Sequence, residues 1–264
     1  MDLNIFTLAV YKSTMKTLNL LLLFIGLQLS LFAQEDISEG AIRLPMINLN
    51  ASFHIPGGDL ADRFGNSALF GVGFQLKNKN NTYWGIEGGG LTGSDIVEDN
   101  IINIITADSI DVIDVNGNTA TIRFWERGAH AQFVLGKIIP VLGPNENSGF
   151  FVQAGLGYMY HKIRIENLGN QVPQLNSEML KGYDRLSMGI STSEFIGYRY
   201  FSNNQKINFF IGLEFIQAFT KDVRQYDYNT QTAYENSRLD LLSGIKFGWT
   251  FPLYKKSDNK YYYY

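Results

Sequence analysis

Three histidines, His54, His130 and His161, are the side chains of this sequence best suited to chemistry. An imidazole can serve as general base toward a serine or bind a metal ion. A nucleophile and its base must lie within hydrogen-bond reach. The three histidines fall at different heights of three alternating segments, and no serine accompanies them in a recognisable motif. We therefore expect hydrogen-bonded structural histidines, no catalytic residue, no metal site and no cofactor.

The segment 92–120 is the other candidate for ligand binding, because it is long and acidic. Its carboxylates are Asp95, Glu98, Asp99, Asp108, Asp111 and Asp114. Several carboxylates can bind Ca²⁺, but the spaced Asp-x-Asp-x-Asp-Gly pattern is missing, so a solvated loop is the favoured interpretation. The segment 53–65, FHIPGGDLADRFG, lacks the Gly-Lys-Ser/Thr of a phosphate-binding loop. We expect it to cap one end of the fold or to meet a partner.

Composition narrows the class of protein. The chain has no cysteine, so it can form neither a disulfide nor a thiolate metal site. The formal charge of -3 and the lack of a basic stripe argue against nucleic-acid binding. Charged residues make up 18%, below the usual ~25%, and aromatic residues 14%. This profile is typical of a β-protein whose rings face lipid.

The segment 237–251 positions the most informative charges, because its side chains alternate. One face carries leucines, Ile245 and three aromatic rings, and the other carries Arg238, Asp240 and Lys246. A period of two indicates a strand whose faces meet different surroundings. In a soluble sandwich the charged face would meet water, whereas in a transmembrane barrel the apolar face would meet lipid.

The rest of the chain repeats this pattern and favours the barrel. Eight strands are predicted, at about 45–55, 67–77, 82–91, 121–139, 149–165, 186–201, 207–219 and 237–251. Proline and paired glycines at 56–58 should end the first strand. Connections after the second, fourth and sixth strands are short, and the others are longer, as in outer-membrane barrels with periplasmic turns and extracellular loops. We predict an all-β, eight-stranded, antiparallel, up-and-down transmembrane barrel; a secreted soluble β-barrel or sandwich is the alternative.

The alternation assigns residues to the inside and outside of this barrel. A polar network filling the lumen is predicted from Glu87, His161, Glu214, Arg238, Asp240 and Lys246, together with Asn48, Asn50, His54, His130 and Gln132. Rings at the membrane interfaces are predicted at Trp84, Tyr158, Tyr160, Tyr198, Trp249 and Phe251. Glu194 breaks the rule, since it shares parity with Ile190 and Ile196. Either a β-bulge shifts the register there, or Glu194 contacts a partner protein.

Targeting signals precede and a tail follows the barrel. Residues 15–33, MKTLNLLLLFIGLQLSLFA, have the basic start and short apolar run of a secretory signal peptide. We expect segment 1–33 to be removed after Ala33, with Met15 as the true start. Segment 34–43 should be a short lead, 44–253 the barrel, and 254–264 a periplasmic tail. That tail ends in candidate partner contacts, Tyr261, Tyr262, Tyr263 and Tyr264; a disordered end is the alternative.

Several pieces of the chain resemble small outer-membrane β-barrel proteins of Bacteroidota, of the PorT-like or outer membrane protein beta-barrel domain family. They are residues 32–34, 53–65, 161–167 (HKIRIEN), 182–186 (GYDRL), 238–249 (RLDLLSGIKFGW) and 261–264. The resemblance implies a structural or accessory component of the outer membrane, in contact with lipid and other envelope proteins, with no catalytic residues. Two alternatives stay open: a channel for small solutes or hydrophobic compounds, and an outer-membrane enzyme that modifies lipid.

Overall fold

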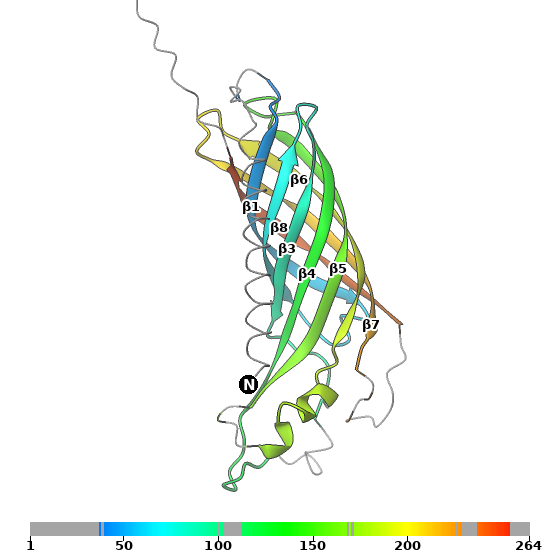
Figure 1. Ribbon diagram of the computed structural model, residues 1–264. Coiled ribbons are helices and arrows are strands. Elements are labelled where there is room, and N and C mark those ends of the chain that lie inside the picture. Colours follow the sequence, from blue (N-terminus) through cyan, green and yellow to red (C-terminus); the bar gives the residue numbers. More distant parts are fainter. Residues whose placement is uncertain are drawn as a thin grey trace, which may run out of the picture.

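The computed structural model describes residues 37, 40–99, 101–102, 112–167, 169, 172–224, 226, 228 and 237–253. The predicted signal peptide, the tail and part of the acidic segment lie outside these residues. Eight strands and two short 3-10 helices make up the described elements (Figure 1): β1 Leu44–Gly58, β2 Ser67–Lys77, β3 Thr82–Gly93, β4 Ile122–Ile139, β5 Gly149–Asn167, η4 Pro173–Leu175, η5 Met179–Gly182, β6 Ser187–Phe201, β7 Asn208–Asp222 and β8 Ser237–Pro252.

The strands form one closed antiparallel ring in chain order, which confirms the predicted barrel architecture. Each strand pairs with the next, and β8 returns to pair with β1, from Met46↔Pro252 to Gly58↔Asp240. Because the ring closes, every strand has a partner on both sides over most of its length, and only strand ends that project from the ring are paired on one side. No helix in the described part of the chain is long and apolar enough to cross a membrane.

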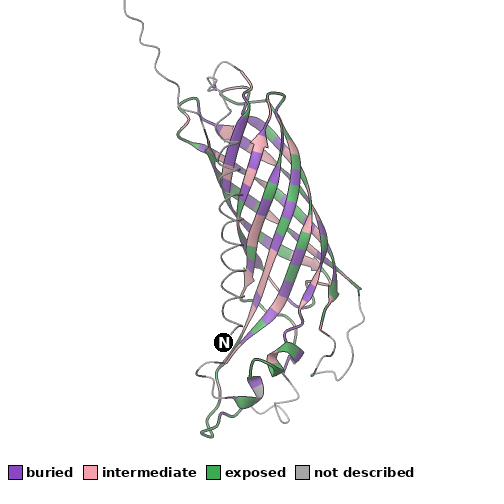
Figure 2. Ribbon diagram, viewed as in Figure 1, coloured by how far each residue is buried: buried purple, intermediate pink, exposed green. Residues whose placement is uncertain are grey.

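Buried and exposed residues alternate along every strand (Figure 2). In β8 the burial pattern places Asp240, Lys246 and Thr250 inside and Ile245 and Phe247 outside. The alternation follows from the pleat, which points successive side chains to opposite faces of the sheet.

The prediction that the Pro-Gly-Gly segment ends the first strand is wrong. β1 continues through Pro56 to Gly58 and pairs there with β8 alone, because its pairing with β2 ends at His54↔Ser67. Proline is tolerated where its ring faces a side of the strand that has no partner. Gly58 ends the strand with a φ of +58°, and a Cβ there would lie 2.3 Å from the Leu239 carbonyl oxygen. Glycine is therefore required at this position.

Short connections occupy one end of the barrel and longer ones the other. The short turns are 78–81, 140–148 and 202–207, and the opposite end carries 59–66, 94–121, 168–186 and 223–236. The extension of β1 makes 59–66 no longer than 140–148, so the difference in length comes from the other three loops. β4 and β5 project beyond the remaining strands on the long-loop side, where η4 and η5 lie (Figure 1).

The lumen is filled in three layers. An apolar cluster near the long loops includes Leu60, Phe64 and Met159. A second apolar cluster near the short turns includes Phe151 and Phe210. Polar and charged side chains fill the space between them, and single polar residues also enter the apolar clusters: His161 packs against Phe64, and Arg199 packs against Phe151 and Phe210.

Candidate functional site

Lys246 lies at the centre of the polar layer and joins opposite walls of the barrel. Its Nζ donates to Glu87 Oε2 and to Glu214 Oε1, both at 2.8 Å. Glu87 comes from β3 and Glu214 from β7, two strands that are not neighbours in the ring. All three side chains are at most 5% exposed, so each charge depends on the others for compensation.

Amides and hydroxyls complete the hydrogen bonding of the two carboxylates. Gln75 donates to Glu87 Oε1 at 2.8 Å, and Gln132 donates to Glu87 Oε2 at 3.2 Å. Ser52 donates to Glu214 Oε2 at 2.8 Å. These neutral donors sit on other strands, and thus the network links most of the barrel wall.

A second cluster lies nearer the long loops and centres on Asp240. His161 Nε2 is 2.8 Å from Asp240 Oδ2, and Thr220 donates to the same oxygen. Arg238 donates to Asp240 Oδ1 at 3.3 Å and to the Asp59 carbonyl oxygen. The six residues predicted for the lumen network therefore divide into two groups, one around Lys246 and one around Asp240.

Each histidine of the lumen bonds a buried carboxylate or hydroxyl group. His54 Nε2 is 3.1 Å from Glu214 Oε2, and Ser52 bonds that same oxygen. A serine that bonds the carboxylate cannot pass its proton to the imidazole, as a nucleophile must. His130 and Ser191 do pair, at 2.9 Å, but both are buried in the lumen wall.

Free space in the polar layer is minimal. The cavity between Glu87, His130, Glu214 and Lys246 has a volume of about 10 Å³. A single water needs roughly 10–15 Å³. The side chains around Lys246 therefore leave no room for a substrate between them.

Arg199 is a lumen residue that the sequence analysis did not single out. It is fully buried in β6, with its guanidinium carbon 3.9 Å from the Phe151 ring centre and 4.8 Å from that of Phe210. It donates to Gln75 Oε1 at 2.9 Å. Cation–π contacts of this kind stabilise a desolvated cation. Its parity with Ser191 and Ser193 is the signal that could have placed it inside.

Gly136 leaves the space that the Tyr83 ring occupies beside Arg199. A Cβ at position 136 would lie 2.1 Å from Tyr83 Oη and 2.5 Å from the Val152 carbonyl oxygen. We expect Gly136→Ala to lower the free energy of unfolding by about 1–3 kcal/mol, because the ring and backbone must both shift. Gly90→Ala is the control, since nothing lies within 4 Å of that position. Urea unfolding of the detergent-folded protein measures both; equal effects would contradict the packing argument.

The predicted girdle residues lie on the outer wall in two groups. Tyr158 and Tyr160 are 48% and 41% exposed on β5, toward the long loops. The others lie toward the short-turn end of their strands: Trp84, Tyr198, Trp249 and Phe251.

Glu194 lies on the outer wall without a bulge. The pairing of β6 runs unbroken through Ala154↔Glu194 and Glu194↔Phe215, so the bulge interpretation is wrong. Glu194 accepts a hydrogen bond of 2.8 Å from Gln217, which accepts one of 2.8 Å from Thr192. These three residues form an outer polar patch between exposed apolar side chains.

The loops on the long-loop side close that end of the barrel. Leu60 and Phe64, in the 53–65 segment, are buried in the apolar cluster, and Arg63 bonds Asp222 and Ser187. Glu98, from the acidic segment, pairs with Arg63 and Arg185.

Asp114 forms its hydrogen bonds within the acidic segment. Its carboxylate accepts from the backbone of Asn118 and Asn116, and these bonds lower its pKa. The described residues contain no group of three or more potential protein ligands for a metal ion. Asp108, Asp111 and the four terminal tyrosines lie outside the described residues.

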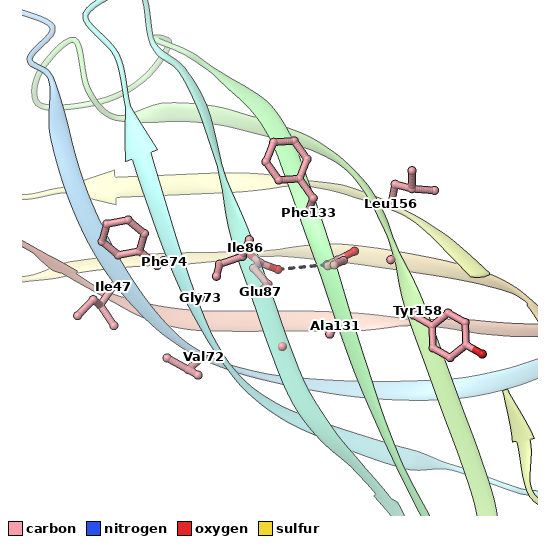
Figure 3. A pocket seen from close by; sticks show the side chains of 13 residues that line it. Ile47, Val72, Gly73, Phe74, Ile86, Glu87, Ala131, Phe133, Leu156 and Tyr158 are labelled. Atoms are coloured by element: carbon pink, nitrogen blue, oxygen red, sulfur yellow. Dashed lines mark hydrogen bonds between the residues drawn. The ribbon is translucent and has the colours of Figure 1, made fainter. Parts of the chain in front are cut away.

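An apolar hollow of about 730 Å³ lies on the outer wall over β1 to β5 (Figure 3). Val72, Ile86 and Phe133 surround it, and Ala131 lies at its floor (Figure 3). Glu87 also borders it but turns inward to bond Gln132, as the dashed line shows. The hollow belongs to the exterior surface and does not open the lumen.

Solved structures of other small barrels are similar to this chain. Ail, the attachment invasion locus protein of Yersinia pestis, aligns with a TM-score of 0.40 at 11% identity, over 79% of this chain and 98% of its own. Neisserial surface protein A aligns with a TM-score of 0.35 at 11% identity, over 77% and 95%. The N-terminal β-barrel domain of Pseudomonas aeruginosa OprF gives 0.32 at 10%, over 78% and 97%. No protein-family model and no curated protein matches this sequence.

Proposed function

We propose that this protein is an integral β-barrel of the bacterial outer membrane. The observation that carries the proposal is the inverted polarity of the barrel. Phe53, Ile86 and Leu156 are 61–66% exposed on the outer wall, whereas Lys246 and Glu214 are 2–3% exposed in the lumen. A soluble barrel would bury the apolar set and expose the charges. An outward apolar band and a polar interior suit a barrel that spans a bilayer.

Within the membrane, we propose that it acts as a non-enzymatic structural or accessory subunit of an envelope secretion or assembly complex. The filled lumen supports this role over that of a channel. Ser52 and His54 both bond Glu214 and not each other, which supports the accessory role over that of a lipid-modifying enzyme. The resemblance to PorT-like barrels also supports it.

We propose that a partner protein contacts the outer polar patch, which consists of Thr192, Glu194 and Gln217. Ile190 and Ile196, 59% and 53% exposed, flank Glu194 on its own strand, so its carboxylate faces hydrocarbon in the proposed orientation. Charged groups facing hydrocarbon cost several kcal/mol unless they are paired. Among the described residues Glu194 has hydrogen-bond support from Gln217 but no cation partner. A membrane protein that presents a basic group at this depth would supply one.

Photo-crosslinking in cells tests this contact. A benzophenone side chain at position 194 should give a discrete adduct with a second protein. The same group at position 72, an exposed valine on β2, should react with lipid only. Equal behaviour at both positions would contradict a partner at the outer polar patch.

Co-purification gives the matching prediction. Glu194→Gln should reduce recovery of the partner by tenfold or more, because a hydrogen bond to a charged group contributes about 1.5–3 kcal/mol. Glu178→Gln, a carboxylate that is 80% exposed near η5, should leave recovery unchanged. The accessory role fails if wild-type protein is recovered alone from gently solubilised membranes and conducts ions in vesicles.

A further inference from the structure

A basic hollow lies on the outer wall where β5 continues past its last pair with β6, His161↔Ser187. It has a volume of about 640 Å³ between the ends of β4 and β5 and the segment 177–184. Five cationic side chains line it: Arg127, Lys162, Arg164, Lys181 and Arg224. We refer to it as the basic hollow.

Two of these cations are held directly opposite each other. Arg127 and Lys162 are register partners on β4 and β5 and point to the same, outer face. Arg164 follows two residues later on that face. Like charges at opposed positions of an antiparallel pair are destabilising. An anion between them would remove the repulsion.

Local contacts orient Arg127 without neutralising it. Its guanidinium lies over the Trp125 ring, 5.2 Å from the centroid, and bonds Thr92 and the Glu126 carbonyl oxygen. Within the described part of the chain Arg127 forms no ion pair. The guanidinium is therefore positioned in advance for an anionic ligand, and guanidinium geometry suits phosphate.

The surrounding carboxylates neutralise only part of the charge. Asp184 contacts Arg224 at 2.5 Å and Lys162 at 3.5 Å. Glu166 contacts Arg164 at 3.5 Å, and Glu178 contacts Lys181 at 3.2 Å. Three carboxylates against five cations leave an excess of two positive charges at the basic hollow.

The basic hollow begins directly after the two outward tyrosines of β5. Tyr158 and Tyr160 precede Lys162 on the outer face of β5. If these rings mark the membrane interface, as the proposed function requires, Lys162 and Arg164 lie at the depth of lipid headgroups on the long-loop side. We propose that Arg127, Lys162 and Arg164 bind the phosphate of a phosphorylated lipid headgroup in the outer leaflet.

Quenching of Trp125 by brominated lipid tests the proposal. The chain has three tryptophans, and Trp84→Phe/Trp249→Phe leaves Trp125 as the sole reporter beside Arg127. This protein is reconstituted into phosphatidylcholine vesicles and titrated with brominated phosphatidic acid, which carries a phosphate monoester. Brominated phosphatidylcholine is the zwitterionic control, because its own choline cation balances the charge of its phosphodiester. Inorganic phosphate is added as competitor to separate a lipid from a soluble anion.

We expect phosphatidic acid to quench Trp125 preferentially. Arg127→Gln/Lys162→Gln should require about 30-fold more phosphatidic acid. Each basic side chain near an anionic membrane surface changes the affinity by roughly fivefold, and the two changes multiply. Lys137→Gln/Lys206→Gln removes the same charge from exposed positions near the short-turn end and should change nothing. Arg164→Gln, at a side chain that is 55% exposed, provides a milder second variant with a several-fold effect.

Three outcomes would overturn the site. They are equal quenching by both lipids, equal affinity in wild type and the basic-hollow variants, and full competition by inorganic phosphate at matched concentration. Insertion is checked first, by heat-dependent migration on a gel. Protein that does not insert would contradict the proposed membrane function itself and the lipid site with it. Insertion without headgroup preference would contradict the lipid site alone.

Discussion

Lys246→Met is expected to lower the free energy of unfolding by about 3–5 kcal/mol. The substitution leaves Glu87 and Glu214 buried without their shared cation, and breaking a buried ion pair from one side typically costs that much. The side chains of Ser52 and Gln75 would still donate to the carboxylates, but neutral donors do not supply the missing charge. Urea unfolding of the protein folded in phosphatidylcholine vesicles, followed by tryptophan fluorescence, measures the loss.

A triple variant separates the charge effect from packing. Glu87→Gln/Glu214→Gln/Lys246→Met removes both carboxylates together with the cation, and we expect it to recover most of the lost stability. Lys206→Met, on an exposed turn, should change stability by less than about 0.5 kcal/mol. If Lys246→Met costs no more than this surface control, the bridge across the lumen does not stabilise the barrel.

Leu213→Arg should cost about 2–4 kcal/mol when the protein is folded in a bilayer. Leu213 is 48% exposed on the outer face of β7, between Ile211 and Phe215. An arginine on the lipid face near the membrane midplane pays this penalty in transmembrane barrels. A soluble barrel would tolerate it, because exposed substitutions usually change stability by no more than about 0.5 kcal/mol.

Val223→Arg is the matched control for the same strand. Val223 is 44% exposed and directly follows the end of β7 on the long-loop side. In the proposed orientation it lies outside the hydrocarbon, and its replacement should cost little. Equal tolerance of both arginines in vesicles would show that the outer wall does not face lipid, and the membrane assignment would have to be abandoned.

Strand positions followed closely from the sequence, as β2 illustrates. The prediction of 67–77 coincides with Ser67–Lys77, because alternation runs unbroken between polar turn residues at both ends. The first strand was predicted too short, since Pro56 and two glycines normally interrupt a ladder. That rule assumes a partner strand on both sides. Here β1 extends beyond its last pair with β2 and is paired with β8 alone.

Glu194 and Arg199 show the limit of parity arguments in opposite ways. A carboxylate among lipid-facing isoleucines favoured a bulge, yet the register of β6 is continuous and the carboxylate stays outside with Gln217. Arg199 shares the inward parity of Ser191 and Ser193, but its aromatic surroundings come from β5 and β7. The sequence indicates which face of the sheet a side chain occupies, but it does not identify the side chains of other strands that contact it.

The sequence by itself determined the eight strands, their sidedness and the end of the barrel that carries the longer loops. These are local properties, since the pleat turns every second side chain to the same face. Only the tertiary structure decided that Lys246 meets both Glu87 and Glu214, and that Arg127 faces Lys162. Such contacts depend on the register of every strand pair around the closed ring, because a slip of one residue at any pair would exchange inner and outer side chains.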